Sequence, residues 1–208
     1  MTDTLLTFQK FGISEQLNPH NSLSFLRKNP YMTVTLLTSI LPLIALVFIT
    51  LFIVVTIHEL GHAIPALLMT RDDVSIYIGS LGDPSRTFHF SIGRLMVFVK
   101  YNPLLWYKGC CTAFDYEFTI NQKLFFVAGG PLASIIGTAG SWRLLSLVQA
   151  GGPLRIIVGS VFVVSLLITL STLFPSARIY YTASGYPIHN DSYRIYRLVR
   201  AKLRQSSW

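Results

Sequence analysis

The sequence predicts a mainly α-helical, polytopic membrane protein, with a three-helix transmembrane core and a small β-sheet at the membrane surface. Hydrophobic residues make up 51% of the 208-residue chain and charged residues only 12%. The mean hydropathy of +0.52 is typical of a membrane protein and not of a soluble domain. Three long apolar segments predict the helices, and short β-branched and aromatic runs between the first two predict the strands.

The chain carries a formal net charge of +8. Nucleic-acid binding is not expected, because the sequence has no nucleic-acid recognition motif and no dense basic run. The charge instead indicates cytoplasmic flanks that face anionic lipid. Residues 1–30 are polar and mixed in composition, so they predict a polar leader and no signal peptide. Residues 31–208 are expected to form a single domain.

The first predicted span covers about residues 33–70 and contains few polar groups apart from hydroxyls and one ionisable motif. With a rise of about 1.5 Å per residue, it is longer than a bilayer core of about 30 Å. Its length fits either one long helix that projects beyond the membrane or a helical hairpin that turns near residue 50. The single helix is favoured, because no Gly, Asn or Asp marks a turn there.

Short runs of β-branched and aromatic residues follow the first span, and glycines separate them. They predict surface strands within about residues 74–100, arranged as a small antiparallel sheet. The strands are expected at Val74–Ile78, Thr87–Ile92 and Leu95–Val99. His89 is expected to be a strand residue and not a metal ligand. The adjacent Cys110 and Cys111 predict buried apolar side chains and no disulfide framework.

The second predicted span covers about residues 122–147, and Ala128-Gly129-Gly130-Pro131 lies near its beginning. Small residues at this density permit helices to approach closely in a membrane. Two interpretations stay open for this motif: plain helix packing, or a helix break that exposes backbone beside a catalytic site. The third span covers about residues 154–174 and ends at Pro175.

A basic tail, residues 176–208, follows the third span and includes a helix-like stretch rich in arginine. This tail is expected to face the cytoplasm. Three spans would then place the N-terminus outside the cell. The pair Arg27-Lys28 counts against that orientation and fits the hairpin better.

The most informative motif is His58-Glu59-Leu60-Gly61-His62, which lies inside the first apolar span. On a helix, HExxH places two imidazoles at positions i and i+4 of one face, where they can hold one Zn²⁺. Glu59 is then close enough to act as general base on a water molecule. Because ionisable groups are expensive in a membrane, these residues predict a metal-dependent hydrolase that works inside the bilayer.

Catalytic zinc usually takes three protein ligands and keeps one position open. Of the nine acidic residues, Asp191 is the best candidate for the third ligand. It follows the third span and a flexible Gly/Pro segment that could fold back toward the helices. His189 is the competing ligand, and Asp191 could instead cap the tail helix.

Together these motifs resemble the site-2 protease family of intramembrane zinc metallopeptidases. The resemblance rests on HELGH in the first span, Ala-Gly-Gly-Pro early in the second, and Leu-Phe-Pro with a later Asn-Asp after the third. It covers about residues 50–198. It implies that His58, His62 and Asp191 bind one Zn²⁺ per chain and that Glu59 activates water. It also implies cleavage of a transmembrane segment near the cytoplasmic face of the cell membrane.

The chain departs from the family pattern at Ser134, Thr172 and Ser192, where the family usually has other residues. Two of the usual residues are Asn side chains that help to hold substrate. The candidates for contact with substrate or with an oxyanion are Gly130, Pro131, Ser134, Thr172 and His189. The departures motivate an alternative function, a catalytically impaired member that serves as a zinc-binding membrane assembly or partner-binding subunit. The retained Glu59 favours the protease, since a structural zinc site needs no base.

The partners implied by this prediction are a transmembrane protein substrate and the lipid bilayer. A regulatory membrane partner and a second copy of the chain are further candidates. An exposed strand between residues 74 and 99 could also pair with an extended substrate segment by β-addition.

Overall fold

The computed structural model describes residues 30–113 and 118–205, with the backbone alone for residues 30–37. The predicted polar leader, together with Arg27 and Lys28, lies outside the described residues, apart from Pro30. The chain divides into two compact units at Ile44. Everything discussed below belongs to the second unit, Ala45–Trp208, except the beginning of the first helix.

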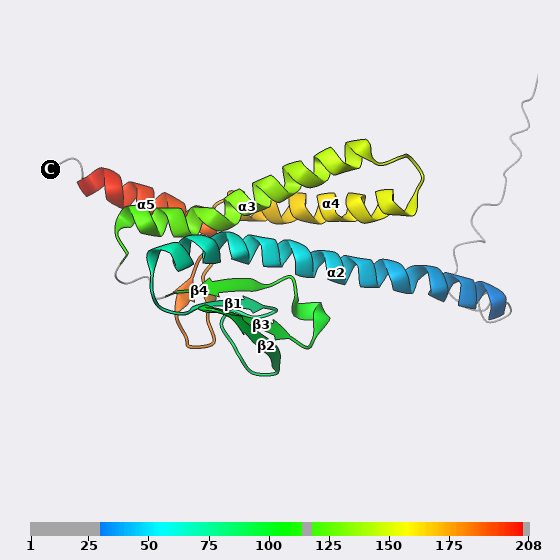
Figure 1. Cartoon of the computed structure of the whole chain (residues 1–208), viewed down its shortest axis with the longest axis horizontal. Coiled ribbons are helices and arrows are strands. Elements are labelled where there is room, and N and C mark those ends of the chain that lie inside the picture. Colours follow the sequence, from blue (N-terminus) through cyan, green and yellow to red (C-terminus); the bar gives the residue numbers. More distant parts are fainter. Residues whose placement is uncertain (1–29, 114–117, 206–208) are drawn as a thin grey trace, which may run out of the picture. The chain divides into compact units, whose positions relative to one another are not determined.

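The described part of the chain is mainly helical, with four α-helices (Figure 1). Their bounds are α2 (Pro30–Met69), α3 (Ile120–Leu147), α4 (Pro153–Leu173) and α5 (Asp191–Gln205). Three of them are long and apolar enough to cross a membrane: residues 38–69 of α2, α3 and α4. The single long helix favoured over a hairpin for the first span is confirmed by the continuous α2.

Specific side chains mark where these helices begin and end. The Arg94 guanidinium donates hydrogen bonds to the Leu67 carbonyl at 2.8 Å and to the Thr70 carbonyl, so a cation closes the C-terminal end of α2. A capping box of Thr119 and Gln122 begins α3. Pro153 occupies the first turn of α4, where its missing N–H costs nothing.

Four strands form one sheet in the order β2-β3-β1-β4. The strands are β1 (Val74–Ile78), β2 (Thr87–Ile92), β3 (Leu95–Lys100) and β4 (Gly109–Thr112). The predicted bounds of the first two strands are confirmed, and the third extends by one residue. His89 lies in β2 as expected and pairs with Phe98. The fourth strand was not predicted, because its Gly-Cys-Cys-Thr sequence lacks the usual β-branched pattern.

The prediction of a purely antiparallel sheet is wrong, because β1 and β3 pair in parallel. The connection from β1 to β2 is long enough to pass over one strand position. A tight hairpin at Gly93, where φ is +58°, then places β3 in the vacant position beside β1. Alternation of residue types predicts strands but carries no information on their direction, which is why the pattern did not reveal this crossover.

The sheet packs on the C-terminal part of α2, and α3 lies on the other side of that helix (Figure 1). Val74, Ile76 and Ile78 of β1 are completely buried. They join Ala63 and Ala66 of α2 in one hydrophobic cluster. Two small alanines on α2 therefore let the inner strand approach the helix that carries the HExxH motif.

Glycines bring α2 and α3 into backbone contact. A Cβ on Gly61 would lie 2.4 Å from the Gly129 carbonyl oxygen, and a Cβ on Gly129 would lie 2.0 Å from the Gly61 oxygen. The predicted alternative of a helix break at Gly-Gly-Pro is wrong, because α3 continues through Pro131. The interpretation as close helix packing is the one that the structure supports.

Three shorter elements complete the described residues. A 3₁₀ turn, η1 (Pro103–Leu105), precedes β4, and β5 (Tyr180–Tyr181) pairs with β6 (Pro187–Ile188) in a hairpin between α4 and α5. The hairpin contacts the loop that follows β1, since the Ala183 N–H donates to the Leu81 carbonyl at 3.0 Å. A chain segment between the last apolar helix and α5 thus contacts the loop that joins β1 to β2.

A buried lysine anchors the loop that follows β1. Lys100 is 8% exposed, and its ammonium lies 2.5 Å from an Asp83 carboxylate oxygen. It also donates to the Ser85 carbonyl. The hydrogen bond from Lys100, followed by those from Ser85, lowers the pKa of Asp83 to about 2.

This ion pair predicts a pH-dependent contribution to stability. The folded pKa of Asp83 lies below the unfolded value of about 3.9, so the contribution is complete above about pH 4 and is lost as the pH falls toward 2. We expect Asp83→Asn to lower the thermal unfolding midpoint at pH 7, and the gap from wild type to shrink below pH 4. Asp73→Asn, at an exposed position, is the matched control. A gap that does not change with pH would contradict the assignment.

Candidate metal centre

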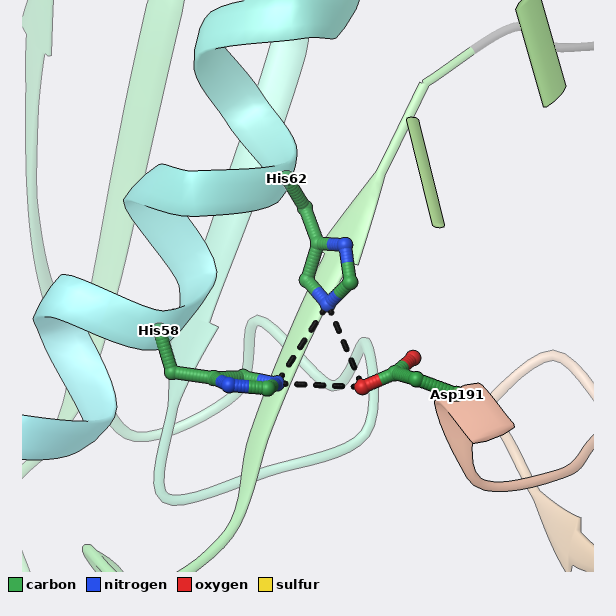
Figure 2. Close-up of side chains that lie close together, drawn as sticks. All are labelled: His58, His62 and Asp191. Carbon is green, nitrogen blue, oxygen red and sulfur yellow. Dashed lines mark hydrogen bonds and ion pairs between the residues drawn. The ribbon is translucent and has the colours of Figure 1, made fainter. Parts of the chain in front are cut away.

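Two imidazoles and one carboxylate converge at a single point beside α2. His58 and His62 lie one turn apart on this helix, and Asp191 is the first residue of α5 (Figure 2). The Nε2 atoms of the two histidines are 3.3 Å apart, and the Asp191 Oδ2 atom lies 3.1 Å from His58 Nε2 and 3.4 Å from His62 Nε2. These three residues could hold a metal ion.

The opposite nitrogen of each imidazole is held by α3. His62 Nδ1 lies 2.9 Å from the Phe126 carbonyl oxygen, and His58 Nδ1 lies 2.8 Å from the Ser134 hydroxyl. A carbonyl can only accept, so His62 Nδ1 carries a proton, and Nε2 is the nitrogen that faces Asp191. Outer hydrogen bonds of this kind orient metal-binding histidines. The donor set is therefore prepared to bind a cation.

The residues on both sides of Asp191 fasten it to the end of α4. The Asn190 amide donates to the Phe174 carbonyl at 2.6 Å, and its Oδ1 accepts from the Ser176 N–H at 3.0 Å. Ser192 donates through its hydroxyl to the Thr172 carbonyl. These bonds place the start of α5 against the end of α4, so the carboxylate reaches His58, 133 residues earlier in the chain, and its neighbour His62.

Asn190, and not Asp191, caps α5. Its Oδ1 accepts from the Tyr193 N–H at 3.2 Å, which is the usual contact of an N-cap residue with the third residue of the helix. The suggestion that Asp191 serves as the cap is therefore wrong. Because Asn190 caps the helix, the Asp191 carboxylate can interact with the histidines instead. A strong N-cap residue directly before an acidic residue was the sequence signal that could have identified Asn190.

The charge of Asp191 is maintained despite its burial. Burial by itself would raise its pKa, but the neighbouring His62 and His58 lower the pKa well below the usual range. The carboxylate side chain is 13% exposed. An anionic oxygen in a nearly closed site is the type of ligand that a divalent cation requires.

Glu59 is buried directly beside the first histidine, with 5% of its surface exposed. Strand β4 passes against its carboxylate, because a Cβ on Gly109 would lie 2.2 Å from Glu59 Oε1. Gly109 was not predicted as a site residue, and its role becomes visible only through this contact.

Cys110 follows Gly109 in β4. Burial raises the pKa of the Cys110 thiol to about 12, so the thiol stays neutral, as expected for the apolar role predicted from the sequence.

Of the other predicted site residues, Gly130 meets the histidine cluster, whereas Thr172 and His189 form their hydrogen bonds elsewhere. Gly130 and Pro131 are buried, and a Cβ on Gly130 would lie 2.2 Å from His62 Nε2. Thr172 donates to the Thr169 carbonyl in its own helix at 3.0 Å. His189 is not part of the group that could hold a metal ion; its Nδ1 lies 3.3 Å from the Arg178 carbonyl. Contact of these residues with a substrate stays a prediction.

The arrangement combines three convergent donor atoms with a buried glutamate next to one of them. It can hold a cation and present a base close by, which are the components of metal-assisted hydrolysis. The Phe126 carbonyl completes the site through the backbone, so no side-chain pattern could have revealed it.

No family model matches the chain, and no curated protein or solved structure shows significant similarity to it.

Loss of the Ser134 hydroxyl should weaken metal binding. Ser134→Ala removes the partner of His58 Nδ1, and loss of such an outer hydrogen bond typically lowers metal affinity by about 10- to 100-fold. The dissociation constant would be measured by competition with a fluorescent chelator. Ser160→Ala is the control, because Ser160 bonds only to a carbonyl of its own helix. Equal affinities in both variants would refute a role for Ser134.

A methyl group at position 130 should displace His62. The added Cβ of Gly130→Ala meets the His62 ring at 2.2 Å, so the ring must leave the cluster or the helices must separate. We expect metal binding to fall at least about tenfold. Gly137→Ala is the matched control on the same helix, since its Cβ meets nothing closer than 3.9 Å. The idea fails if both alanine variants bind metal like wild type.

Proposed function

We propose that the chain is an intramembrane zinc metalloprotease similar to the site-2 protease family. One observation carries the proposal: His58, His62 and Asp191 direct three donor atoms to one point, and Glu59 is buried beside them. A purely structural role for the histidines does not explain the glutamate buried beside them. The chain would hydrolyse a peptide bond in or near a transmembrane segment of another protein.

Zinc is the ion that best fits these donors. Two imidazole nitrogens and one carboxylate oxygen are a usual ligand set for catalytic zinc, with the fourth position left open. Tetrahedral geometry with bonds of about 2.0–2.1 Å separates ligand atoms by about 3.3–3.4 Å. The separations between the three donor atoms are 3.1, 3.3 and 3.4 Å. The chemistry that a bound zinc ion supplies is Lewis-acid polarisation of water and of the scissile carbonyl.

The residues of the chain would carry the proton transfers and the positioning. Glu59 takes a proton from the attacking water and later donates it to the leaving amine. Ser134 and the Phe126 carbonyl keep the imidazoles in the required orientation. Asp191 supplies a negative charge that offsets the positive charge of the ion.

The exposed apolar surfaces of the helices support a bilayer location. Leu41 and Ile49 of α2, Ile136 of α3 and Leu167 of α4 are each more than half exposed. In water such a surface would favour aggregation, whereas in a bilayer it faces lipid. We therefore place the chain in the cell membrane as a multi-pass protein. The basic residues of α5, the helix that begins at Asp191, support a site on the cytoplasmic side of the membrane.

A substrate must reach this site in an extended conformation, because helical hydrogen bonds shield its carbonyls. Strand β4 is an edge of the sheet and contacts Glu59 through Gly109. An extended substrate segment that pairs with this edge by β-addition would have its backbone next to the base. A transmembrane protein is thus the substrate class that the proposal specifies.

Metal content and cleavage together test this proposal. We expect about one zinc per chain in detergent-purified wild type, by elemental analysis, and little in His58→Ala or Asp191→Ala. Glu59→Gln should retain the zinc, since it removes the base and no ligand. Its rate of cleavage of bilayer-reconstituted single-span substrates should fall by at least about 100-fold, the usual contribution of a general base.

The contradicting results have distinct meanings. Wild type with zinc but without cleavage of a broad substrate panel would favour the alternative, a zinc-binding assembly or partner-binding subunit. Iron in place of zinc would point to a different chemistry for the same three ligands. Cleavage that persists at the wild-type rate in Glu59→Gln would refute the role of the base.

A further inference from the structure

A second site lies in the surface sheet, in a pocket of about 630 Å³. Loops from three parts of the chain form its walls: residues 79–86, residues 100–108 and the tip of the β5–β6 hairpin. Its volume lies in the range of small-molecule sites, which is about 300–1,000 Å³. None of the three metal-binding residues lines it. The metal centre therefore does not explain this pocket.

Two cations in the pocket wall have no acidic partner. Lys100 is fully engaged by Asp83 and Ser85, so that pair is neutral and structural. Arg86 and Lys108 also line the pocket, and neither forms an ion pair with any described residue. Lys108 does lie over the Tyr107 ring, with its ammonium 5.4 Å from the centroid, but an aromatic ring does not neutralise its charge. Cations without an acidic partner in a concave site favour an anion.

Arg86 holds an unusual backbone conformation at this pocket. Its φ is +50°, and it is the one residue other than glycine with a positive φ in the described chain. The Tyr101 N–H, from another wall, donates to the Arg86 carbonyl at 3.3 Å. Strain of this type persists where the surroundings enforce it, and it concentrates at ligand sites. The loop thus fixes an arginine in the pocket wall.

The pocket adjoins a surface that faces the apolar part of α2. The Trp106 ring contacts Phe52 of α2, with centroids 5.2 Å apart, and its N–H donates to the Lys100 carbonyl at 2.8 Å. Nearby, Tyr101, Leu104 and Tyr107 are 70%, 64% and 59% exposed. Exposed aromatic and apolar side chains beside a membrane helix are typical of the headgroup region. An anionic ligand there would come from lipid.

We infer that this pocket binds the phosphate headgroup of an anionic phospholipid, with Arg86 and Lys108 as its counter-charges. A phosphomonoester carries up to two negative charges and three acceptor oxygens, which match the guanidinium fork and the ammonium. The exposed apolar residues would lie against the acyl chains. The inference rests on the bilayer location proposed above, but not on zinc binding or on cleavage.

Fluorescence of Trp106 provides a local readout. In a Trp142→Phe, Trp208→Phe background, only Trp106 remains to report. The full-length protein would be placed in phosphatidylcholine nanodiscs with rising fractions of dibrominated phosphatidic acid, whose bromines quench tryptophan on contact. We expect saturable quenching at a lower fraction than with dibrominated phosphatidylcholine. Arg86→Asn with Lys108→Gln should raise the half-saturating fraction by about tenfold, as loss of charge-assisted hydrogen bonds predicts.

Matched variants separate this site from general charge attraction. Asn tolerates positive φ, so Arg86→Asn should fold, and an unchanged thermal unfolding midpoint would verify this. Arg197→Gln with Arg200→Gln removes the same charge from exposed positions of α5 and should leave half-saturation nearly unchanged. The inference would be overturned if both double substitutions raised the half-saturating fraction equally, or if the protein showed no selectivity for phosphatidic acid. Displacement of the lipid by excess inorganic phosphate would assign the pocket to free phosphate instead.

The assay also separates this inference from the protease proposal. It can be performed in Glu59→Gln and after removal of metal by a chelator, because its signal requires neither. Loss of lipid selectivity with zinc and cleavage intact would refute only the lipid site. Retained selectivity in a chain without zinc or cleavage would refute only the protease.

Discussion

The orientation of two imidazoles by α3 is the constraint on which the candidate site depends. The histidine side chains are long enough to turn away from each other, and α2 alone does not restrict them to one rotamer. Hydrogen bonds to Ser134 and to the Phe126 carbonyl remove that freedom. They require α3 to approach α2 closely, which Gly61 and Gly129 make possible. Small residues in the helix interface and polar ligands in the site are therefore parts of one arrangement.

The third ligand depends on a different interaction, the attachment of α5 to the end of α4. Asn190 forms hydrogen bonds with the Phe174 carbonyl and the Ser176 amide and also caps α5. These backbone groups would otherwise lack partners where α4 ends before Pro175. One amide side chain thus satisfies the end of one helix and the beginning of the next. Asp191 follows it directly, so the geometry of the helix junction is transmitted to the carboxylate.

The surface sheet contributes to both proposed sites. Its inner strand β1 packs on α2 beside Ala63 and Ala66, and its edge strand β4 lies against Glu59 at Gly109. The loop after β1 folds around Lys100 and forms one wall of the second proposed site, the pocket that Arg86 and Lys108 line. The tip of the β5–β6 hairpin contacts this loop, and the same segment leads to Asp191. Occupation of the pocket would thus restrain a segment that ends at the metal centre.

The sequence by itself determined the helices, strands and motif spacings that depend only on residues close together in the chain. Apolar length predicted the three long helices, alternation predicted two strands with their observed bounds, and HExxH spacing placed His58 and His62 on one helical face. Asp191 was singled out because acidic residues are scarce in this chain. The tertiary structure alone decided the direction of β3, the continuity of α3 through Pro131 and the capping role of Asn190. These depend on contacts between distant segments and, at Phe126, on a backbone carbonyl that is chemically the same in every residue.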